Sequence, residues 1–410
     1  MKRIIFHLLA LITSFLTGWF LVDFLTVHPL KMTLYLVFTL LGLVLLVIWI
    51  SALKTKRGRW VSVLVSLIAF LGGYSLNTHS FLSREDPRFV PELTRKAGDP
   101  GKGHVAVIYF THGEPETYDP IGWINQFREF DEQGIKFVPF VARPVFAYVL
   151  RNKYLEAGKS NHRQVHQEML RSLEKTYRLD GDSSTRFYLC FLDDEPRPDA
   201  AVIQALNEGA DTIVVADIFL TISNHTAEGQ NLIREIEVEE KLGIPVIYTE
   251  PMWSSELLRS VFLEKVYAQM GSTPREEVAV ALVGHGQPDE WDVEWATETE
   301  QEMAFREEIM KLFAADGFRP ENLGSAWMEF KDPKPASLME TFVENGATKI
   351  FYFSAAISAD AMHSQIDVPR LVEEYELPEG VETKNLGAWN NHPTVIAAIR
   401  ERIGKTMAAF

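Results

Sequence analysis

Four of the eleven histidines stand where an imidazole could bind a metal or accept a proton. Two of them belong to a fifteen-residue stretch that occurs twice, as VAVIYFTHGEPETYD at 105–119 and as VAVALVGHGQPDEWD at 278–292. The two copies align without a gap, which places His112 on His285, each directly after an apolar run. We infer an internal duplication of a whole domain.

The other two histidines follow a second pair of matching segments. GADTIVVADIFLTISNH ends at His225 and GATKIFYFSAAISADAMH ends at His363, with a difference of one residue in length. Imidazole suits Fe, Co, Ni, Cu and Zn, and two imidazoles would leave positions open for water or substrate. The alternative for any one histidine is a hydrogen-bonded structural role. Because the pair occurs in both halves, we expect a metal-binding or catalytic role in at least one of them.

The two halves differ between their paired histidines. The second half reads AWMEFKDPKP and the first reads LCFLDDEPRP, and alignment of Gly346 on Gly209 puts Glu329 opposite Leu192. The second half therefore offers a carboxylate from a third strand end, whereas strand alternation turns Asp193 of the first half to the other face. We predict a working site of His285, Glu329 and His363. The alternative for Glu329 is a solvated residue at a strand end.

Strand-like and helix-like stretches alternate from Val105 to the end of the chain. This order predicts two duplicated, doubly wound parallel-sheet α/β domains, in which ligands bind at the carboxyl ends of strands. Both His-Gly pairs fall at such an end. IKFVPFVA, at 135–142, is expected to form one of the strands. The expected domains are a membrane anchor at 1–80, a linker at 81–103, and α/β domains at 104–270 and 271–410.

Three apolar runs at the start of the chain have roughly membrane-spanning length, at 4–25, 32–53 and 60–76. A cleaved signal peptide would explain only the first run, and buried core helices are the other alternative. Basic residues precede the first run and fill the second loop, so the positive-inside rule puts both in the cytoplasm. Three crossings then place the soluble domains on the extracytoplasmic side. If the third run only lies on the surface, the soluble part stays inside.

The charge of the chain is divided unevenly. Residues 1–84 carry a net charge of +7 and residues 85–410 carry −23, which together give the −16 of the whole chain. Phosphate binding needs basic surface, so this charge argues against nucleic acid as a partner, and we expect none. The single cysteine, Cys190, excludes an intramolecular disulfide and a cysteine-based metal site.

Taken together, the motifs of residues 104–410 resemble those of the class II tetrapyrrole chelatases. This superfamily includes sirohydrochlorin cobaltochelatase, sirohydrochlorin ferrochelatase and protoporphyrin ferrochelatase. The pieces that carry the resemblance are VGHGQPDEWD, MEFKDPKP, NGATKI and HSQIDVP. The Ser-Ala-His-Ser stretch of protoporphyrin ferrochelatases is absent, and HSQIDVP at 363–369 is closer to the cobaltochelatase or sirohydrochlorin branch.

The resemblance implies insertion of a divalent metal, Co²⁺ or Fe²⁺ with Ni²⁺ as a further possibility, into a tetrapyrrole without a nucleotide. It also implies that His285 and His363 bind metal or accept pyrrole protons and that Glu329 joins them. The rival hypothesis is a non-catalytic, membrane-anchored protein that carries metal or haem. The expected partners are a tetrapyrrole and, through residues 1–80, a lipid membrane, and a homodimer stays open. The metal-binding candidates in both halves are His112, His225, His285, His363 and Glu329.

Overall fold

The computed structural model describes residues 2–410 except 54, 86–87, 133, 135 and 137. The chain forms two compact units. The helical unit comprises Met1–Pro87 and Thr117–Lys159, and the α/β unit comprises Arg88–Glu116 and Ser160–Phe410. The division follows the charge, because the helical unit carries a net charge of +6 and the α/β unit carries −22.

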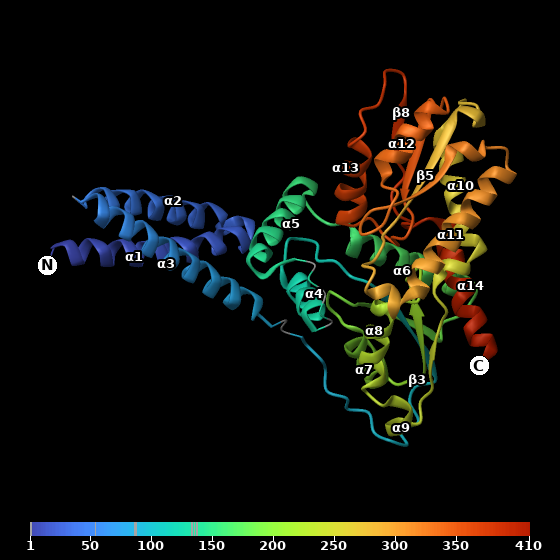
Figure 1. Cartoon of the computed structure of the whole chain (residues 1–410). Helices are drawn as coiled ribbons and strands as arrows, with labels where there is room; N and C mark the ends of the chain where they lie inside the picture. The colour runs from blue at the N-terminus through green and yellow to red at the C-terminus, as the bar shows by residue number, and fades with distance from the viewer. Residues whose placement is uncertain (1, 54, 86–87, 133, 135, 137) are drawn as a thin grey trace. The chain divides into compact units, whose positions relative to one another are not determined.

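The α/β unit contains two four-stranded parallel sheets with the same strand order. The first sheet runs β2-β1-β3-β4 and the second runs β6-β5-β7-β8. This confirms the predicted fold class of two doubly wound α/β domains (Figure 1). The strands are β1 (His104–Thr111), β2 (Thr185–Phe191), β3 (Ala210–Asp217), β4 (Val246–Tyr248), β5 (Val278–Gly284), β6 (Leu323–Trp327), β7 (Lys349–Ser354) and β8 (Glu382–Asn385).

Equivalent strands are paired in equivalent register. Phe110 of β1 lies between Cys190 and Asp217, and Val283 of β5 lies between Ala326 and Ser354. All residues of β5, and all but one of β1, are buried, as expected for central strands of a sheet that helices cover on both faces. The histidine after each central strand therefore leaves its sheet at the same edge.

The two sheets share one hydrophobic core. Buried side chains from both halves, including Tyr109, Leu282 and Trp389, belong to a single cluster, while each half has a separate smaller cluster on its other face. The C-terminal helix α14 packs against both α10 and α6. The covering helices are α6 (His162–Leu179), α7 (Pro198–Asn207), α8 (Asn224–Arg234), α9 (Val238–Leu242), α10 (Glu256–Met270), α11 (Ala296–Ala315), α12 (Pro335–Glu344), α13 (Val368–Glu373) and α14 (Pro393–Ala409).

The helical unit begins with α1 (Lys2–Thr26), α2 (Pro29–Ser51) and α3 (Lys56–Leu82), drawn in blue in Figure 1. Within the described part of the chain, these three helices are long and apolar enough to cross a membrane. Leu, Ile and Val side chains lie exposed along all three, which is typical of helices solvated by lipid and unusual for buried core helices.

The segment 117–159 departs from the expected α/β pattern. It forms α4 (Ile121–Glu132), the short 3-10 helix η1 (Phe140–Ala142) and α5 (Arg143–Ala157), and it belongs to the helical unit. The expected strand at 135–142 is wrong, because its described residues form a bend and η1. Pro139 has no N–H to give to a sheet, and the carbonyl of Val141 accepts a hydrogen bond from Tyr74 of α3. The predicted domain boundaries stay a prediction.

Candidate active site

The backbone conformation of each His-Gly pair requires glycine at the second position. Gly286 has φ of +84°, and a Cβ there would lie 2.4 Å from the carbonyl oxygen of Glu329. Gly113 has φ of +95°, and a Cβ there would lie 2.8 Å from Cβ of Phe191. The positive φ and the close approach both favour glycine over any residue with a side chain. The glycines therefore let each histidine loop pass directly beside the end of the neighbouring strand.

The ring of each of these histidines is held by the carbonyl of its own glycine. Nδ1 of His285 lies 2.7 Å from the oxygen of Gly286, and Nδ1 of His112 lies 2.9 Å from the oxygen of Gly113. A carbonyl oxygen only accepts, so Nδ1 carries the hydrogen and donates it. In the neutral ring, Nε2 is then the basic nitrogen, which can bind a metal or accept a proton.

The structure brings the predicted histidines together in pairs. The rings of His285 and His363 have centroids 5.3 Å apart, and those of His112 and His225 have centroids 4.7 Å apart. Both pairs are close to T-shaped, at 76° and 74°. All four side chains are half-buried. The two pairs are also near each other, because the ring of His225 lies 6.2 Å from that of Trp291 and feels the charges of both His112 and His285.

Burial keeps two of these imidazoles neutral. The pKa of His225 is held well below its usual value by burial, and secondarily by His112 and His285. The pKa of His285 is also lowered, first by burial and then by His363, while the carboxylates of Glu329 and Glu302 act in the opposite direction. Neutral rings at physiological pH have the lone pairs that metal binding and proton transfer require.

His363 lies on a π-helix, η6 (His363–Asp367). Nδ1 of His363 lies 2.8 Å from Oδ2 of Asp367, one turn further along. A carboxylate on one ring nitrogen orients an imidazole and raises the basicity of the other nitrogen. π-Helical turns occur frequently at functional sites, and this turn brings His363 to His285.

The first half holds this π-helix in place. The N–H of Met362 donates to both carboxylate oxygens of Glu114, at 3.1 and 3.2 Å. The N–H of Asn161 donates to Oε1 of Gln365 at 3.0 Å. Glu114 follows the His112-Gly113 pair, so the histidine loop of the first half anchors the segment that carries His363. This role was not expected from the sequence, in which Glu114 stands in an acidic loop.

For the metal insertion that the resemblance implies, we therefore expect Glu114→Ala to lower kcat by about 10- to 100-fold, because misplacing a reacting group by about 1 Å has an effect of this order. Glu114→Gln keeps an oxygen that accepts from Met362 and should retain most of the activity. The measurement is kcat with the metal saturating, together with the thermal unfolding midpoint of each variant. Equal activity in the alanine variant and the wild type would exclude a positioning role for Glu114.

Glu329 follows the end of β6, at the place that the alignment assigned to it. Its N–H donates to the carbonyl oxygen of His285 at 3.0 Å, and its half-buried carboxylate partly opposes the lowering of the pKa of that histidine. Among the residues that the structure describes, no three His, Cys, Asp or Glu side chains are arranged to hold a metal ion together. The set of His285, Glu329 and His363 therefore stays a prediction.

A second layer of titratable side chains lies beneath both histidine loops. In the second half, the N–H of His285 donates to Oε1 of Glu302, which is 3% exposed, at 3.0 Å. Burial raises the pKa of Glu298, one turn earlier in α11, to about 8, and the carboxylates of Glu302 and Asp292 add to this effect. These residues were missed because an acidic helix resembles a solvated one in sequence.

The first half has histidines at the matching places. His166 of α6 shares hydrogen bonds with Tyr109 and Thr111 of β1 at 3.0 and 3.1 Å, and with Ser358 of the second half at 3.2 Å. Burial lowers the pKa of His166 to about 3. His162 is one turn earlier, as Glu298 is relative to Glu302. The duplicated halves thus differ in chemistry below the histidine loops as well as at Glu329.

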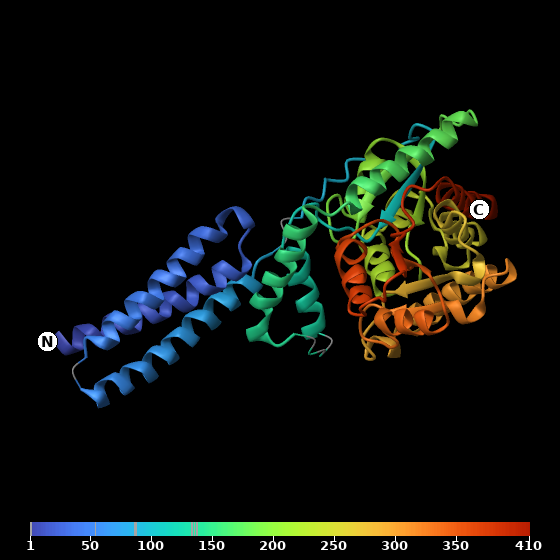
Figure 2. The same cartoon turned by 90° about the horizontal axis from the view of Figure 1, so that it is seen from above.

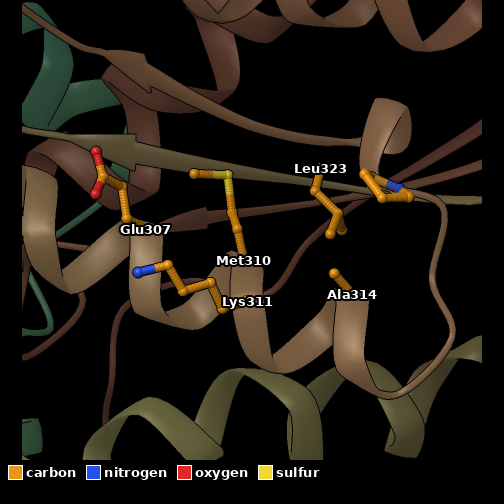
Figure 3. Close-up of a pocket in the computed structure, with 6 residues that line it drawn as sticks. Glu307, Met310, Lys311, Ala314 and Leu323 are labelled. Atoms are coloured by element: carbon orange, nitrogen blue, oxygen red, sulfur yellow. The ribbon is translucent and has the colours of Figure 1, made fainter.

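A shallow pocket of about 300 Å³ lies elsewhere in the second half, between α11 and β6 (Figure 3). None of the predicted site residues lines it. Its lining side chains are Glu307, Met310, Lys311, Ala314, Pro320 and Leu323.

The CbiX family model matches residues 279–406, which contain the second sheet together with His285, Glu329 and His363. The match falls on the part of the chain that carries the motifs MEFKDPKP and HSQIDVP, and it agrees with the resemblance to the class II chelatases there. No curated protein matches the chain.

Solved structures of low identity are similar to the chain. SirB from Bacillus subtilis with Fe³⁺ is 16% identical, with a TM-score of 0.47 over 74% of this chain and 96% of SirB. SirB from Bacillus subtilis subspecies spizizenii, in complex with cobalt, is 13% identical, with a TM-score of 0.45 over 74% and 95%. DR2241 from Deinococcus radiodurans, a multi-domain protein with structural similarity to chelatases, is 12% identical, with a TM-score of 0.45 over 74% and 56%.

Proposed function

We propose that this protein inserts a divalent metal ion, Co²⁺ or Fe²⁺, into a tetrapyrrole such as sirohydrochlorin or a porphyrin. The observation that carries the proposal is the meeting of His285 and His363, 5.3 Å apart between ring centroids, within the segment that matches CbiX. The choice of sirohydrochlorin and of cobalt or iron follows the motifs that resemble the class II chelatases. The metal is a substrate of this reaction and no nucleotide takes part.

Metal insertion requires the removal of two pyrrole N–H protons as the metal arrives, so the site must supply bases that are neutral near pH 7. Nε2 of His285 is such a base, because Nδ1 is occupied by the carbonyl of Gly286 and burial lowers the pKa of the ring. His363, oriented by Asp367, faces it. In our proposal these two imidazoles bind the incoming metal and accept the protons, and Glu329 assists them.

The three apolar helices anchor the enzyme in a membrane in this proposal, and the positive-inside rule predicts that the α/β unit lies on the extracytoplasmic side.

The net charge of −22 on the α/β unit should also affect how fast a tetrapyrrole binds. Like charges lower association rates, so a tetrapyrrole with few carboxylates should be bound faster than one with many.

The second candidate function is that of a carrier that binds metal or haem without turnover. The presence of a histidine pair in each half favours it, since two imidazoles suffice to ligate a metal and the first half has Leu192 opposite Glu329. A carrier needs no carboxylate to accept a proton, whereas the enzyme does.

Metallation of sirohydrochlorin and of protoporphyrin by the purified full chain, with Co²⁺, Fe²⁺ and Ni²⁺ supplied in turn and absorbance followed, tests the proposal. The full chain is needed because segment 117–159 packs on the N-terminal helices. We expect many turnovers above the rate without protein. The matched control is the double variant His285→Ala/His363→Ala, which should show only that background rate. Stoichiometric binding of metal or haem without turnover would instead establish the carrier.

A further inference from the structure

Segment 117–159, which we call the insert, is built onto one end of the three apolar helices. Two of its side chains donate to backbone carbonyls at the C-terminal end of α1. Arg151, fully buried, donates to the carbonyls of Phe24 and Val27 at 2.6 and 2.9 Å, and Tyr118 donates to that of Thr26 at 3.1 Å. These bonds satisfy groups at the C-terminus of α1, where a cation is also favoured by the helix dipole.

The insert and the bundle also share a small hydrophobic core. Val22 of α1, Phe81 of α3, Ile124 of α4 and Ala147 of α5 are all buried in one cluster. Both views show α4 and α5 beside the end of the blue helices (Figure 1, Figure 2). The insert is therefore a fixed part of the helical unit, joined by short connections to the His112 loop and to α6.

One turn of the insert contacts α3 well before the C-terminal end of that helix. The hydroxyl of Tyr74 donates to the carbonyl of Val141 at 2.7 Å, and Tyr74 is eight residues before the end of α3 at Leu82. At 1.5 Å per residue, this turn lies about 12 Å along the helix from its end. Helix α3 has 27 residues and is thus about 40 Å long, against a hydrocarbon core of about 30 Å. Helix α3 is thus about 10 Å longer than the hydrocarbon core. With this excess at the end of α3 that carries the insert, the turn at Val141 lies at about the boundary between headgroups and acyl chains.

Apolar side chains are exposed along η1 and the first part of α5. Val141, Val145 and Val149 are 58%, 47% and 46% exposed and recur at intervals of four residues, so they form a stripe along η1 and α5. Phe140, at the start of η1, is 39% exposed. A stripe of this kind at the height of the membrane interface matches the surface of a helix that lies in the interface plane, buried about 5–10 Å.

We propose that the insert is a membrane-surface element whose Val141–Val145–Val149 stripe enters the interface of the bilayer that the three apolar helices cross. The occupant of this face is lipid in our proposal, because Val141 accepts a hydrogen bond from Tyr74 of α3, a helix whose exposed apolar side chains suit a lipid environment. The insert itself carries a net charge of only +1, so its apolar stripe and not charge attraction carries the proposal. The proposal rests on the membrane anchoring described above and is independent of the chelatase reaction.

Spin labels at single cysteines in the full chain test the proposal. Cys190, the sole cysteine, is buried and is first replaced in a Cys190→Ala background. Nitroxides are then attached to Val145→Cys and Val149→Cys in vesicles of phosphatidylcholine and phosphatidylglycerol in equal amounts. Oxygen, which concentrates in lipid, and a water-soluble nickel chelate serve as relaxing agents. Leu41→Cys on α2 is the matched control for lipid, and Leu179→Cys at the end of α6 is the matched control for water; these side chains are 52% and 75% exposed.

We expect the labels at Val145 and Val149 to relax faster with oxygen than with the chelate, as the Leu41 label does, with the Leu179 label showing the reverse. Labels at both valines that behave like the one at Leu179 would overturn the proposal, as would labels shielded from both agents, which would mean that protein covers the stripe. A Leu41 label that is accessible to the chelate would contradict the membrane anchoring on which the proposal rests. In all of these cases the metallation assay still decides the proposed function separately.

Discussion

Replacement of His285 or His363 by alanine is expected to lower kcat/KM for metal insertion by about 10³-fold or more, which in practice abolishes turnover. Each change removes a base of the kind that contributes about 10²–10⁴-fold to proton transfer, together with a possible metal ligand. His112→Ala and His225→Ala should cost about 10-fold or less, because their half has Leu192 where the second half has Glu329. The measurement is the steady-state rate of metallation, with the unfolding midpoint of each variant as the control for folding.

The relative size of these losses tests the asymmetry between the halves. Equal loss from all four alanine variants would contradict it and would indicate one site that needs all four imidazoles. Such a joint site is geometrically feasible, because His225 lies near both His112 and His285. Larger losses in the first half than in the second would reverse the assignment of the working site.

The pH dependence of the wild-type reaction follows from the same residues. His285 accepts a proton only when neutral, so the rate should fall on the acid side as His285 becomes protonated. Burial lowers the pKa of His285 below its usual value of 6.5, so the acid limb should lie below pH 6.5. An acid limb above pH 6.5 would be inconsistent with His285 in its present environment as the acceptor.

Glu329→Gln is expected to lower kcat by about 10²-fold while leaving the binding of the tetrapyrrole nearly unchanged. The amide keeps the size of the side chain but removes its charge and its basic oxygen, and general acid–base catalysis by one group contributes about 10²–10⁴-fold. The measurement is kcat and KM for both the metal and the macrocycle. Glu379→Gln, in an exposed loop, is the matched control and should behave as the wild type.

The same variant separates the two candidate functions. A bis-imidazole carrier should bind haem or metal equally well with glutamine at position 329, because neither imidazole depends on the carboxylate for ligation. An unchanged rate of insertion in Glu329→Gln would show that the histidines act without it and would remove Glu329 from the site. A loss of binding together with activity would assign Glu329 to the metal ligands and not to proton transfer alone.

The pattern of apolar runs was sufficient to determine the fold class. Strands β1 and β5 are buried along nearly their whole length, so their sequences are continuous apolar runs, and each is followed by a glycine that a tight turn requires. Parallel strands end at one edge of a sheet, so residues that follow neighbouring strands must meet there. The pairings of His112 with His225 and of His285 with His363 could therefore be predicted from their positions alone.

Only the tertiary structure decided what surrounds these pairs. Glu114 and Met362, which form the hydrogen bonds that hold the π-helix, are 248 residues apart, and no local pattern relates them. Glu302 could not be picked out in an acidic helix, and only packing buries it and lets it accept from the N–H of His285. The insert at 117–159 was assigned to the α/β domain by the order of its apolar runs, yet it folds onto the apolar helices. Long-range contacts can override the structure that a local sequence pattern favours. Here Arg151 and Tyr74 donate to backbone carbonyls far away in the sequence, and no local pattern predicts these hydrogen bonds.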